Sequence, residues 1–380
     1  MITDAISKDK CVGCGACVNS CAAQALSFSP DQYGFLMPSV TGNCIQCGKC
    51  IKACPLLNSR EKCIETKAYA AYAKDPTVRK ASSSGGIFSL LANEVLKAKG
   101  LVYGAAFDNN YSVKHICVED DKHLEQLRGA KYAQSDVDHI FTAIQQDLKS
   151  GQFVLFSGTP CQVAGLSSFL GKKFDNLLLI DMVCHSVPSP LAWKKYVEYR
   201  SKKDETYCLP SAINMRSKHT GWSDYHYSCL FSYPNGRNYS QIGYKDLYID
   251  LFTQGCISRT SCANCQFKGY DRISDITLGD FWGIWDICPE MDDNLGTSLL
   301  LVHSDKGKKY LSSIREKIRF KELTLNDSSK YNPAILNSAI PNKSRSYYLD
   351  KTCQGKYDQV AKKLYSKPSF LTRVKHKIKP

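Results

Sequence analysis

The chain has 380 residues, 43% of them hydrophobic and 23% charged, with a formal net charge of +14 at pH 7. This composition is typical of a soluble globular protein with sizeable cores, divided into two or three domains. No stretch approaches the roughly 18 apolar residues of a membrane span, and the start has no apolar signal core, so we expect a cytoplasmic protein.

The first predicted element is a pair of cysteine runs. Each has the C-x2-C-x2-C-x3-C spacing that bacterial ferredoxins use to hold cubane [4Fe-4S] clusters, whereas zinc sites would use cysteines in pairs. In such modules the fourth cysteine of each run points at the other cluster. We therefore predict a two-cluster ferredoxin domain over residues 1–60, which moves electrons one at a time. One cluster is assigned to Cys11, Cys14, Cys17 and Cys54, and the second to Cys44, Cys47, Cys50 and Cys21.

From residue 67 short apolar runs alternate with amphipathic segments, the pattern of an α/β domain with a mixed sheet flanked by helices. The runs predict strands at 69–73, 101–107, 153–157 and 177–183, and helices at 86–97, 137–149, 162–170 and 191–201. Past residue 205 we predict a hairpin over 225–232 and 237–242, strands at 276–278 and 298–303, and a helix near 308–318. The fold class is thus α+β or α/β, with a small ferredoxin-type domain followed by a larger domain.

A further group of cysteines follows the predicted strands of this larger domain. Cys161 and Cys184 come just past two strand ends, where ligands bind in open α/β sheets, and Cys262 and Cys265 have the two-residue spacing of a metal pair. We predict that these four hold a third cubane. The sequence does not exclude Cys256 as a substitute ligand. For the C-x-x-C pair, a redox dithiol or a zinc half-site remains an alternative. The lone cysteines are expected to be small apolar filler: Cys63, Cys117, Cys208, Cys229, Cys288 and Cys353.

A run of serines and glycines opens the first helix of the larger domain. Ser82 to Gly86 offer hydroxyls and exposed N–H groups at a helix N-terminus, which suits a phosphate, although such runs are also common helix caps. Lys131 is a nearby cation in sequence. No G-x-G-x-x-G or P-loop run appears, so neither a dinucleotide fold of that type nor nucleotide hydrolysis has direct support.

Taken in order, these motifs resemble the coenzyme F420 hydrogenase/dehydrogenase beta-subunit family. The resemblance spans about residues 67–300 and rests on an ordered set of motifs: Ser82-Ser83-Ser84-Gly85-Gly86, Lys131-Tyr132-Ala133-Gln134-Ser135, Gly158-Thr159-Pro160-Cys161-Gln162, Cys184-His185-Ser186-Val187-Pro188, Cys262-x-x-Cys265 and Ser274-Asp275-Ile276-Thr277-Leu278-Gly279-Asp280-Phe281-Trp282. It divides the larger domain into a beta-subunit-like N-terminal flavin-binding region, 67–205, and a C-terminal region, 206–340.

The resemblance implies a bound FAD, a [4Fe-4S] cluster in the main body, and an FAD-dependent oxidoreductase that exchanges a hydride with a small carrier such as the deazaflavin coenzyme F420. The alternative is a non-catalytic electron-transfer or accessory protein, for example in surface-polysaccharide biosynthesis. For His185 the sequence leaves two roles undecided: a proton relay, or a structural residue that only forms hydrogen bonds. The flavin contacts carried over from the matching motifs are Ser82, Ser83, Ser84, Gly85, Gly86, Lys131, Gln134, Ser135, Thr159 and Gln162.

The last segment, 341–380, is predicted to be a basic tail. Residues 343–380 hold eleven Lys or Arg and two Asp, a net charge of +9. With few apolar residues to anchor a core, the tail is expected to be dispensable for cofactor content and free to contact an anionic surface. The expected partners are a redox protein or the small carrier, without a specific nucleic acid. Catalytic residues, substrate, direction of electron flow, physiological donor and oligomeric state are not predicted from the sequence.

Overall fold

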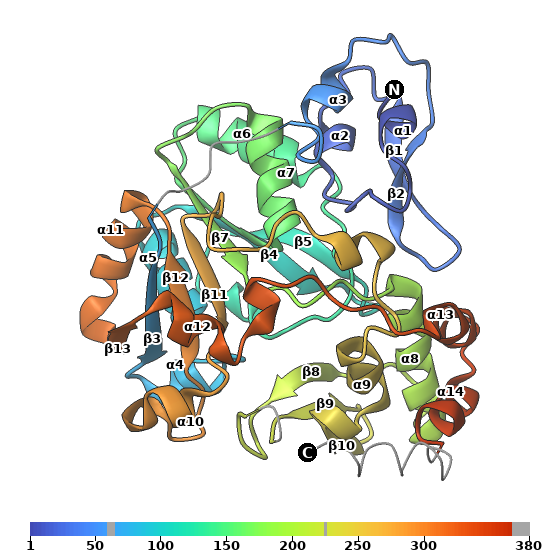
Figure 1. Ribbon diagram of the computed structural model, residues 1–380, viewed down its shortest axis with the longest axis vertical. Coiled ribbons are helices and arrows are strands. Elements are labelled where there is room, and N and C mark those ends of the chain that lie inside the picture. Colours follow the sequence, from blue (N-terminus) through green and yellow to red (C-terminus); the bar gives the residue numbers. More distant parts are fainter. Residues whose placement is uncertain (59–64, 224–225, 367–380) are drawn as a thin grey trace.

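The computed structural model describes residues 1–58, 65–223 and 226–366, so Cys63 and the start of the predicted hairpin at Tyr225 lie outside the described residues. A small N-terminal module projects from one end of the larger body (Figure 1). In this module the short helices α2 and α3 each begin directly after a left-handed glycine of a cysteine run, Gly15 or Gly48. Its elements are α1 (Ile2–Ala5), α2 (Ala16–Asn19), the antiparallel pair β1 (Leu26–Pro30) and β2 (Leu36–Val40), and α3 (Lys49–Lys52).

The body is built on an eight-stranded mixed sheet in the order β13-β3-β12-β11-β7-β6-β4-β5. The four central strands β11, β7, β6 and β4 run parallel, while all other neighbours are antiparallel. This arrangement confirms the predicted mixed sheet flanked by helices. The strands are β3 (Lys67–Ala73), β4 (Leu101–Phe107), β5 (Val113–Val118), β6 (Val154–Gly158), β7 (Leu177–Met182), β11 (Ile276–Asp280), β12 (Ser298–Val302) and β13 (Ile318–Leu323).

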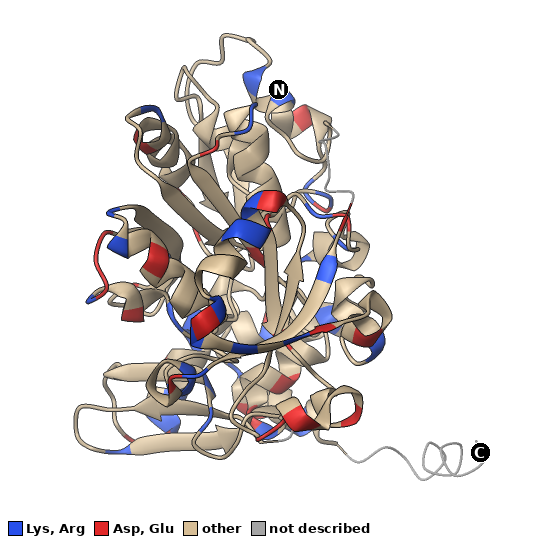
Figure 2. Ribbon diagram, turned by 90° about the vertical axis from the view of Figure 1, so that its left-hand side faces the viewer, with Lys and Arg blue, Asp and Glu red and all other residues tan. Residues whose placement is uncertain are grey.

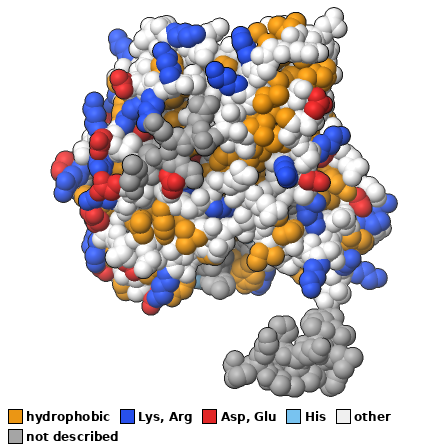
Figure 3. Space-filling model, turned by 45° about the horizontal axis from the view of Figure 1, so that its top comes forward, with side chains coloured by type: hydrophobic (Ala, Val, Ile, Leu, Met, Phe, Trp, Pro, Cys, Tyr) orange, Lys and Arg blue, Asp and Glu red, His pale blue; other side chains and the backbone are white. Residues whose placement is uncertain are grey.

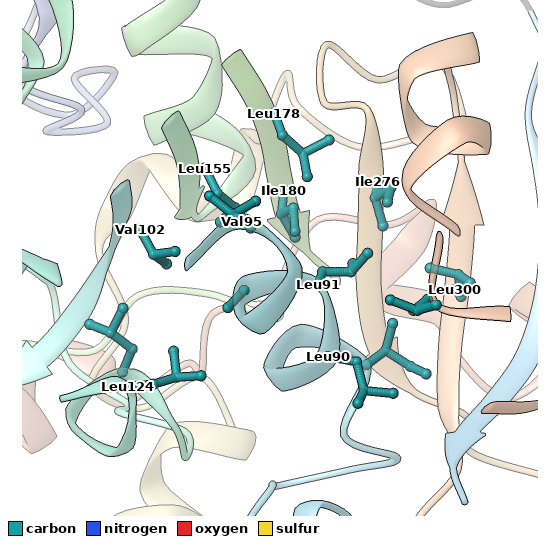
Figure 4. Packing of buried hydrophobic residues seen from close by; sticks show 14 of the residues in the cluster. Leu90, Leu91, Val95, Val102, Leu124, Leu155, Leu178, Ile180, Ile276 and Leu300 are labelled. Atoms are coloured by element: carbon teal, nitrogen blue, oxygen red, sulfur yellow. The ribbon is translucent and has the colours of Figure 1, made fainter. Parts of the chain in front are cut away.

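Helices cover both faces of this sheet because successive strand residues point to opposite sides. On one face, Leu90, Leu91 and Val95 of α5 pack on Val102, Leu155, Leu178, Ile180 and Ile276 of the strands (Figure 4). On the other face, α6 and α7 pack on the neighbouring residues, among them Tyr103, Phe156 and Leu177. The covering helices are α4 (Pro76–Lys80), α5 (Ile87–Lys97), α6 (Ile140–Lys149), α7 (Pro160–Leu170) and α11 (Asp305–Ser313).

A second core lies beside the main sheet. It is centred on aromatic side chains such as Trp193, Tyr196, Phe231 and Tyr248, all fully buried. A three-stranded antiparallel sheet in the order β10-β9-β8 forms part of it. Its elements are α8 (Pro190–Lys203), β8 (Ala212–Ser217), β9 (Ser228–Ser232), β10 (Asn238–Ile242) and α9 (Leu247–Thr253).

The expectation of a basic tail from residue 341 is wrong for the part of that segment that the structure describes. Residues Arg345–Cys353 form α13 and Tyr357–Leu364 form α14, and both pack on α8 and its surroundings in the second core (Figure 1). Leu349, Tyr357 and Val360 are completely buried there. Their amphipathic spacing was concealed by the lysines on the outer faces of the helices.

The other predicted elements occur close to their expected positions, with one exception. The helix expected near 308–318 ends at Ser313, and the alternating residues Ile318–Leu323 instead form edge strand β13. Strands β5, β8 and β13 had not been predicted. The short helices α4, α9, α10 (Ile284–Ile287) and α12 (Leu325–Lys330) were also missed. Strands β11, β12 and β13 follow residue 206 yet share the sheet with β3 to β7, so regions 67–205 and 206–340 form one body.

The surface carries both signs of charge. Figure 2 shows basic and acidic residues interspersed along the ribbon, and in the described residues no helix is long and apolar enough to cross a membrane. Hydrophobic side chains form a band on the top of the molecule, which Figure 3 turns forward. In the N-terminal module the exposed hydrophobic residues are Met1, Val40, Ile45, Ile51 and Leu57.

Candidate functional site

The eight cysteines of the N-terminal module line two separate cavities, in the grouping that the spacing predicts. Cys11, Cys14, Cys17 and Cys54 line a largely apolar cavity within the module. The other four line a more open cavity of about 1100 Å³, where Cys44 and Cys47 are exposed. The grouping fits two cubanes, one shielded and one near the surface: Cys21, Cys44, Cys47 and Cys50 are the second set.

The four cysteines predicted for a third cluster line one small cavity in the body. Cys161 lies at the start of α7, Cys184 follows β7, and Cys262 and Cys265 come from the loop after α9. In the described residues no three Cys, His, Asp or Glu side chains converge tightly enough for a single metal ion. The cysteines instead surround a space, as the four-iron body of a cubane requires. Cys256 does not line this cavity but is buried in the second core.

Polar atoms around this cavity support a bound anionic group. Among the described residues, seven buried side-chain N or O atoms have no hydrogen-bond partner, and three of them belong to residues that line this cavity: His185 Nε2, Ser261 Oγ and Arg272 Nη2. Lys268 is a further cation in the lining, while no Asp or Glu belongs to it. Buried donors are rarely left unpaired in native proteins. The donor set therefore fits a thiolate-bound cluster, whose sulfurs accept hydrogen bonds.

Burial also controls the protonation of these thiols. It raises the pKa of Cys161 to about 12, and it raises the pKa of Cys184 and Cys262 above the ordinary range, with neighbouring cysteines adding to the effect. Metal ligation requires thiolates. Cluster insertion must therefore displace protons from these side chains.

A larger cavity of about 1530 Å³, partly open to solvent, lies at the carboxyl ends of the parallel strands β6, β7 and β11. It is adjacent to the cysteine cavity because Cys161 and Val187 line both. Val12 of the module lines both of these cavities and also the shielded module cavity. The three cavities therefore meet around one loop of the module.

Nine of the ten residues predicted as flavin contacts line this larger cavity; Gly85 does not. Gly85 packs against the sheet, where a Cβ would come within 2.4 Å of Ala71 O. The serine hydroxyls are partly engaged, since Ser84 Oγ donates to Thr297 O. Gln162 caps α7, because its Oε1 accepts from the Thr159 N–H at 3.0 Å. The nine residues are Ser82, Ser83, Ser84, Gly86, Lys131, Gln134, Ser135, Thr159 and Gln162.

Sequence reasoning missed several other lining residues. His115 Nε2 donates to Ser157 O at 3.1 Å, its Nδ1 lies 2.7 Å from Ser135 Oγ, and burial lowers the pKa of His115 to about 4. Arg128, Asp181 and Asp280 also line the cavity. Asp280 lies in the motif from Ser274 to Trp282 but was not predicted as a contact, and only the fold brings it together with Arg128 and Asp181.

Arg259 joins the N-terminal module to the body. It is only 4% exposed, and its guanidinium donates to Cys11 O at 2.8 Å, to Leu36 O at 3.1 Å and to Gln134 Oε1 at 3.1 Å. Gln134 Oε1 also accepts from the Leu36 N–H at 2.9 Å. The Gln134 side-chain oxygen therefore forms its hydrogen bonds at the contact between the module and the body. Arg259 carries no sequence motif, although it precedes Cys262 by only three residues.

Helix α7 approaches the shielded module cavity at Gly165. A Cβ on this residue would lie 2.9 Å from both Cβ and Sγ of Cys14. Because Cys14 is assigned to a cluster, it cannot retreat without moving that cluster. Replacing Gly165 with alanine is expected to lower the free energy of unfolding by about 1–3 kcal/mol through overpacking, and to reduce iron retention. Denaturant unfolding and iron analysis measure both effects.

The matched control for this change is Ser167→Ala, a partly buried position on the same helix, which should change neither quantity appreciably. A Gly165→Ala protein with full iron content and unchanged unfolding would show that α7 does not constrain Cys14.

Comparisons with known proteins agree with this organisation. The 4Fe-4S dicluster domain matches residues 10–70. The N-terminal model of the coenzyme F420 hydrogenase/dehydrogenase beta subunit matches residues 68–141, and the C-terminal model matches residues 151–328. A solved structure from Methanosarcina barkeri, the F420-reducing [NiFe] hydrogenase complex, is similar at 14% identity and a TM-score of 0.45, covering 80% of this chain and 92% of that one. No curated protein matches the sequence.

Proposed function

The chain belongs to the coenzyme F420 hydrogenase/dehydrogenase beta-subunit family, with an iron–sulfur electron-transfer module at its N-terminus, and from this we propose that it is an iron–sulfur flavoprotein oxidoreductase. It passes electrons between its [4Fe-4S] clusters and FAD and exchanges a hydride with a small carrier of the deazaflavin type. The observation that carries the proposal is the shared wall of the cavities. Cys161 lines both the cysteine cavity and the larger cavity, so a group bound in one lies next to a group bound in the other.

The larger cavity has the polarity that a dinucleotide flavin requires. At one side lie the cations Arg128 and Lys131 and the N-terminus of α5, which no side chain caps. Free N–H groups of a first helical turn bind phosphate oxygens. The pyrophosphate of FAD is therefore assigned to this side. The lining also contains Cys161, Met182 and Val183 at the sheet edge, and this part is assigned to the ring.

A flavin supplies the conversion between two-electron hydride chemistry and one-electron transfer to clusters. The chain supplies its placement. The serine run and α5 bind the phosphates, Arg128 and Lys131 neutralise them, and the apolar residues of the strands exclude water from the ring. This size and polarity favour a cofactor-binding enzyme over an electron-transfer subunit without a substrate cavity.

The exposed module cavity is assigned to the contact with a redox partner. Cys44 and Cys47 are exposed there, and Ile45 between them is 66% exposed. An apolar rim around an exposed cluster suits a transient redox contact, because it brings the two redox centres close together. Electrons then have a continuous route through the shielded module cavity to the third cysteine cavity.

FAD binding is expected to weaken as the pH rises above 7. Burial lowers the pKa of the Lys131 ammonium to about 7, so in the unliganded protein this group loses its proton near neutrality. A bound pyrophosphate stabilises the charged form, and binding above pH 7 then takes up one proton. The Kd of FAD should rise up to about tenfold per pH unit above pH 7 and be flat below pH 6. Fluorescence titration of flavin-depleted protein with FAD, repeated from pH 5.5 to 8.5, measures this Kd.

Lys131→Met is the matched variant for this titration, since it keeps the side-chain stem and removes the charge. It should bind FAD more weakly and without this pH dependence. A fully iron-loaded, folded chain that binds no FAD would contradict the flavoprotein proposal. Flavin that is reduced by one-electron dyes but never exchanges a hydride with F420 would instead favour the electron-transfer subunit.

A further inference from the structure

Arg272 lines the cysteine cavity and is connected to the larger cavity through Asp181. Its side chain is 3% exposed, and its Nη1 lies 3.3 Å from Oδ2 of Asp181, which lines the larger cavity. Its Nε donates to Gly269 O at 2.7 Å. Its Nη2 is buried without a partner, and Arg272 belongs to the lining of the cysteine cavity. One guanidinium is thus held from two sides while its third nitrogen lacks an acceptor.

We propose that Arg272, with Ser261, donates hydrogen bonds to the third cluster and makes it the most easily reduced of the three, so that electrons from the module run inward to the flavin. This inference rests on the proposed function and adds the direction of electron flow. Arg272 is a positioning residue for the cluster and takes no part in bond making.

The physical basis is the charge of the cluster. A cubane on four thiolates is anionic and gains one more negative charge on reduction, so cations and N–H or O–H donors stabilise the reduced form more strongly. In a buried site the effect is larger because the effective dielectric is low. Lys268 adds a second cation to the lining, and its Nζ donates to Cys184 O and Ala334 O.

The two module cavities lack this environment. The shielded one is lined mainly by apolar residues, including Ile2, Val12 and Phe28, with Lys8 as its one charged lining residue. The exposed one has Lys49 in its lining, together with Asp4 and the Met1 ammonium, which pair with each other at 2.7 Å. Arg259 is a second cation near the shielded cavity, but its three guanidinium nitrogens already donate to Cys11 O, to Gln134 Oε1 and to Leu36 O and Met37 Sδ, so it offers no unpartnered nitrogen. Burial with few cations and without such donors disfavours the additional negative charge of a reduced cluster. The reduction potential should therefore be higher at the third cluster than at either module cluster.

The test is a redox titration of the anaerobic, fully loaded chain, followed by electron paramagnetic resonance. The signal absent from a Cys161→Ser protein identifies the third cluster. In the wild-type chain this signal is expected to appear at the highest potential of the three. The double variant Arg272→Met with Asp181→Asn removes the cation without leaving a buried carboxylate unpaired. It should lower the equilibrium constant for reduction of the third cluster at least tenfold, which corresponds to a fall in reduction potential of about 59 mV for one electron.

Two further variants keep the test decisive. Arg200 and Asp204 form another ion pair and line neither cavity of the body, so Arg200→Met with Asp204→Asn should leave the potential unchanged. Ser261→Ala removes one unpartnered hydroxyl with little risk to folding, and should lower the potential by a smaller amount.

Two results would overturn the inference while the oxidoreductase proposal stands. The first is a third cluster with the lowest reduction potential of the three in the wild-type chain. The second is a reduction potential of the third cluster that stays the same in both the Arg272 double variant and Ser261→Ala. A loaded chain without a third cluster signal overturns the premise instead.

Discussion

Replacing Cys161 with serine is expected to remove about four of about twelve irons per chain, since each [4Fe-4S] unit holds four. Serine changes the side-chain volume little but replaces a soft thiolate with a poor ligand for a cubane. Because Cys161 lines the larger cavity as well, the variant should also separate any bound flavin from the electron path. Iron analysis of anaerobically prepared protein measures the first effect, and the rate of flavin reduction by a reduced ferredoxin measures the second.

Cys256→Ser is the matched control. Cys256 is completely buried in the second core and outside the cysteine cavity, so its replacement should keep all irons. The reverse outcome, with iron retained in Cys161→Ser and lost in Cys256→Ser, would keep a third cluster and overturn its ligands. A wild-type chain with only about eight irons, otherwise fully loaded, would refute the third cluster.

The cysteine sets could be predicted from the sequence because their signal is local, and in the structure each set lines one cavity. Spacing within a run follows from the loop that wraps a cluster, and strand ends place Cys161 and Cys184 at one edge of the sheet. The residues that surround the third cavity give no such signal. Arg272 and Ser261 are ordinary polar residues in a loop, and only the folded chain shows that their polar atoms lack partners beside the cysteines.

The fold was predictable where elements are apolar and continuous. The central strands β4, β6 and β7 are buried on both faces and appear in the sequence as apolar runs. In the edge strands β5 and β13, apolar residues are mixed with polar or charged ones. Strand β13 also follows a lysine-rich helix after only a short connection. Their pairing with distant strands, rather than local propensity, determines their conformation.

The C-terminal helices show why a charge count is a weak guide to disorder. The net charge of +9 over residues 343–380 predicted a mobile tail, yet the apolar positions of α13 and α14 fall on one side of each helix. Tyrosines contribute much of that side, and a tyrosine buries a large apolar ring while its hydroxyl finds a partner. Tyr357 OH, for example, donates to Ala192 O at 2.6 Å.

Ending the chain at Asn342 is therefore expected to destabilise the body and lower its cofactor content, the opposite of the expectation for a tail. The deletion exposes the second core, because Tyr348, Leu349, Tyr357 and Val360 are buried there. Each such side chain contributes about 1.5–3 kcal/mol by burial, and the sum is comparable with a whole domain's stability of about 5–15 kcal/mol. It also removes Arg345, whose Nε donates to Ser258 O near the cysteine loop.

The single change Leu349→Ala isolates the packing contribution. It should lower the free energy of unfolding by about 2–5 kcal/mol, measured by denaturant unfolding, because Leu349 is completely buried. Lys362→Ala on the exposed side of α14 is the matched control and should have little effect. A chain ending at Ser366 keeps both helices and should retain iron and flavin. Equal iron and flavin in the chains ending at Asn342 and Ser366 would show that the protein holds its cofactors without α13 and α14.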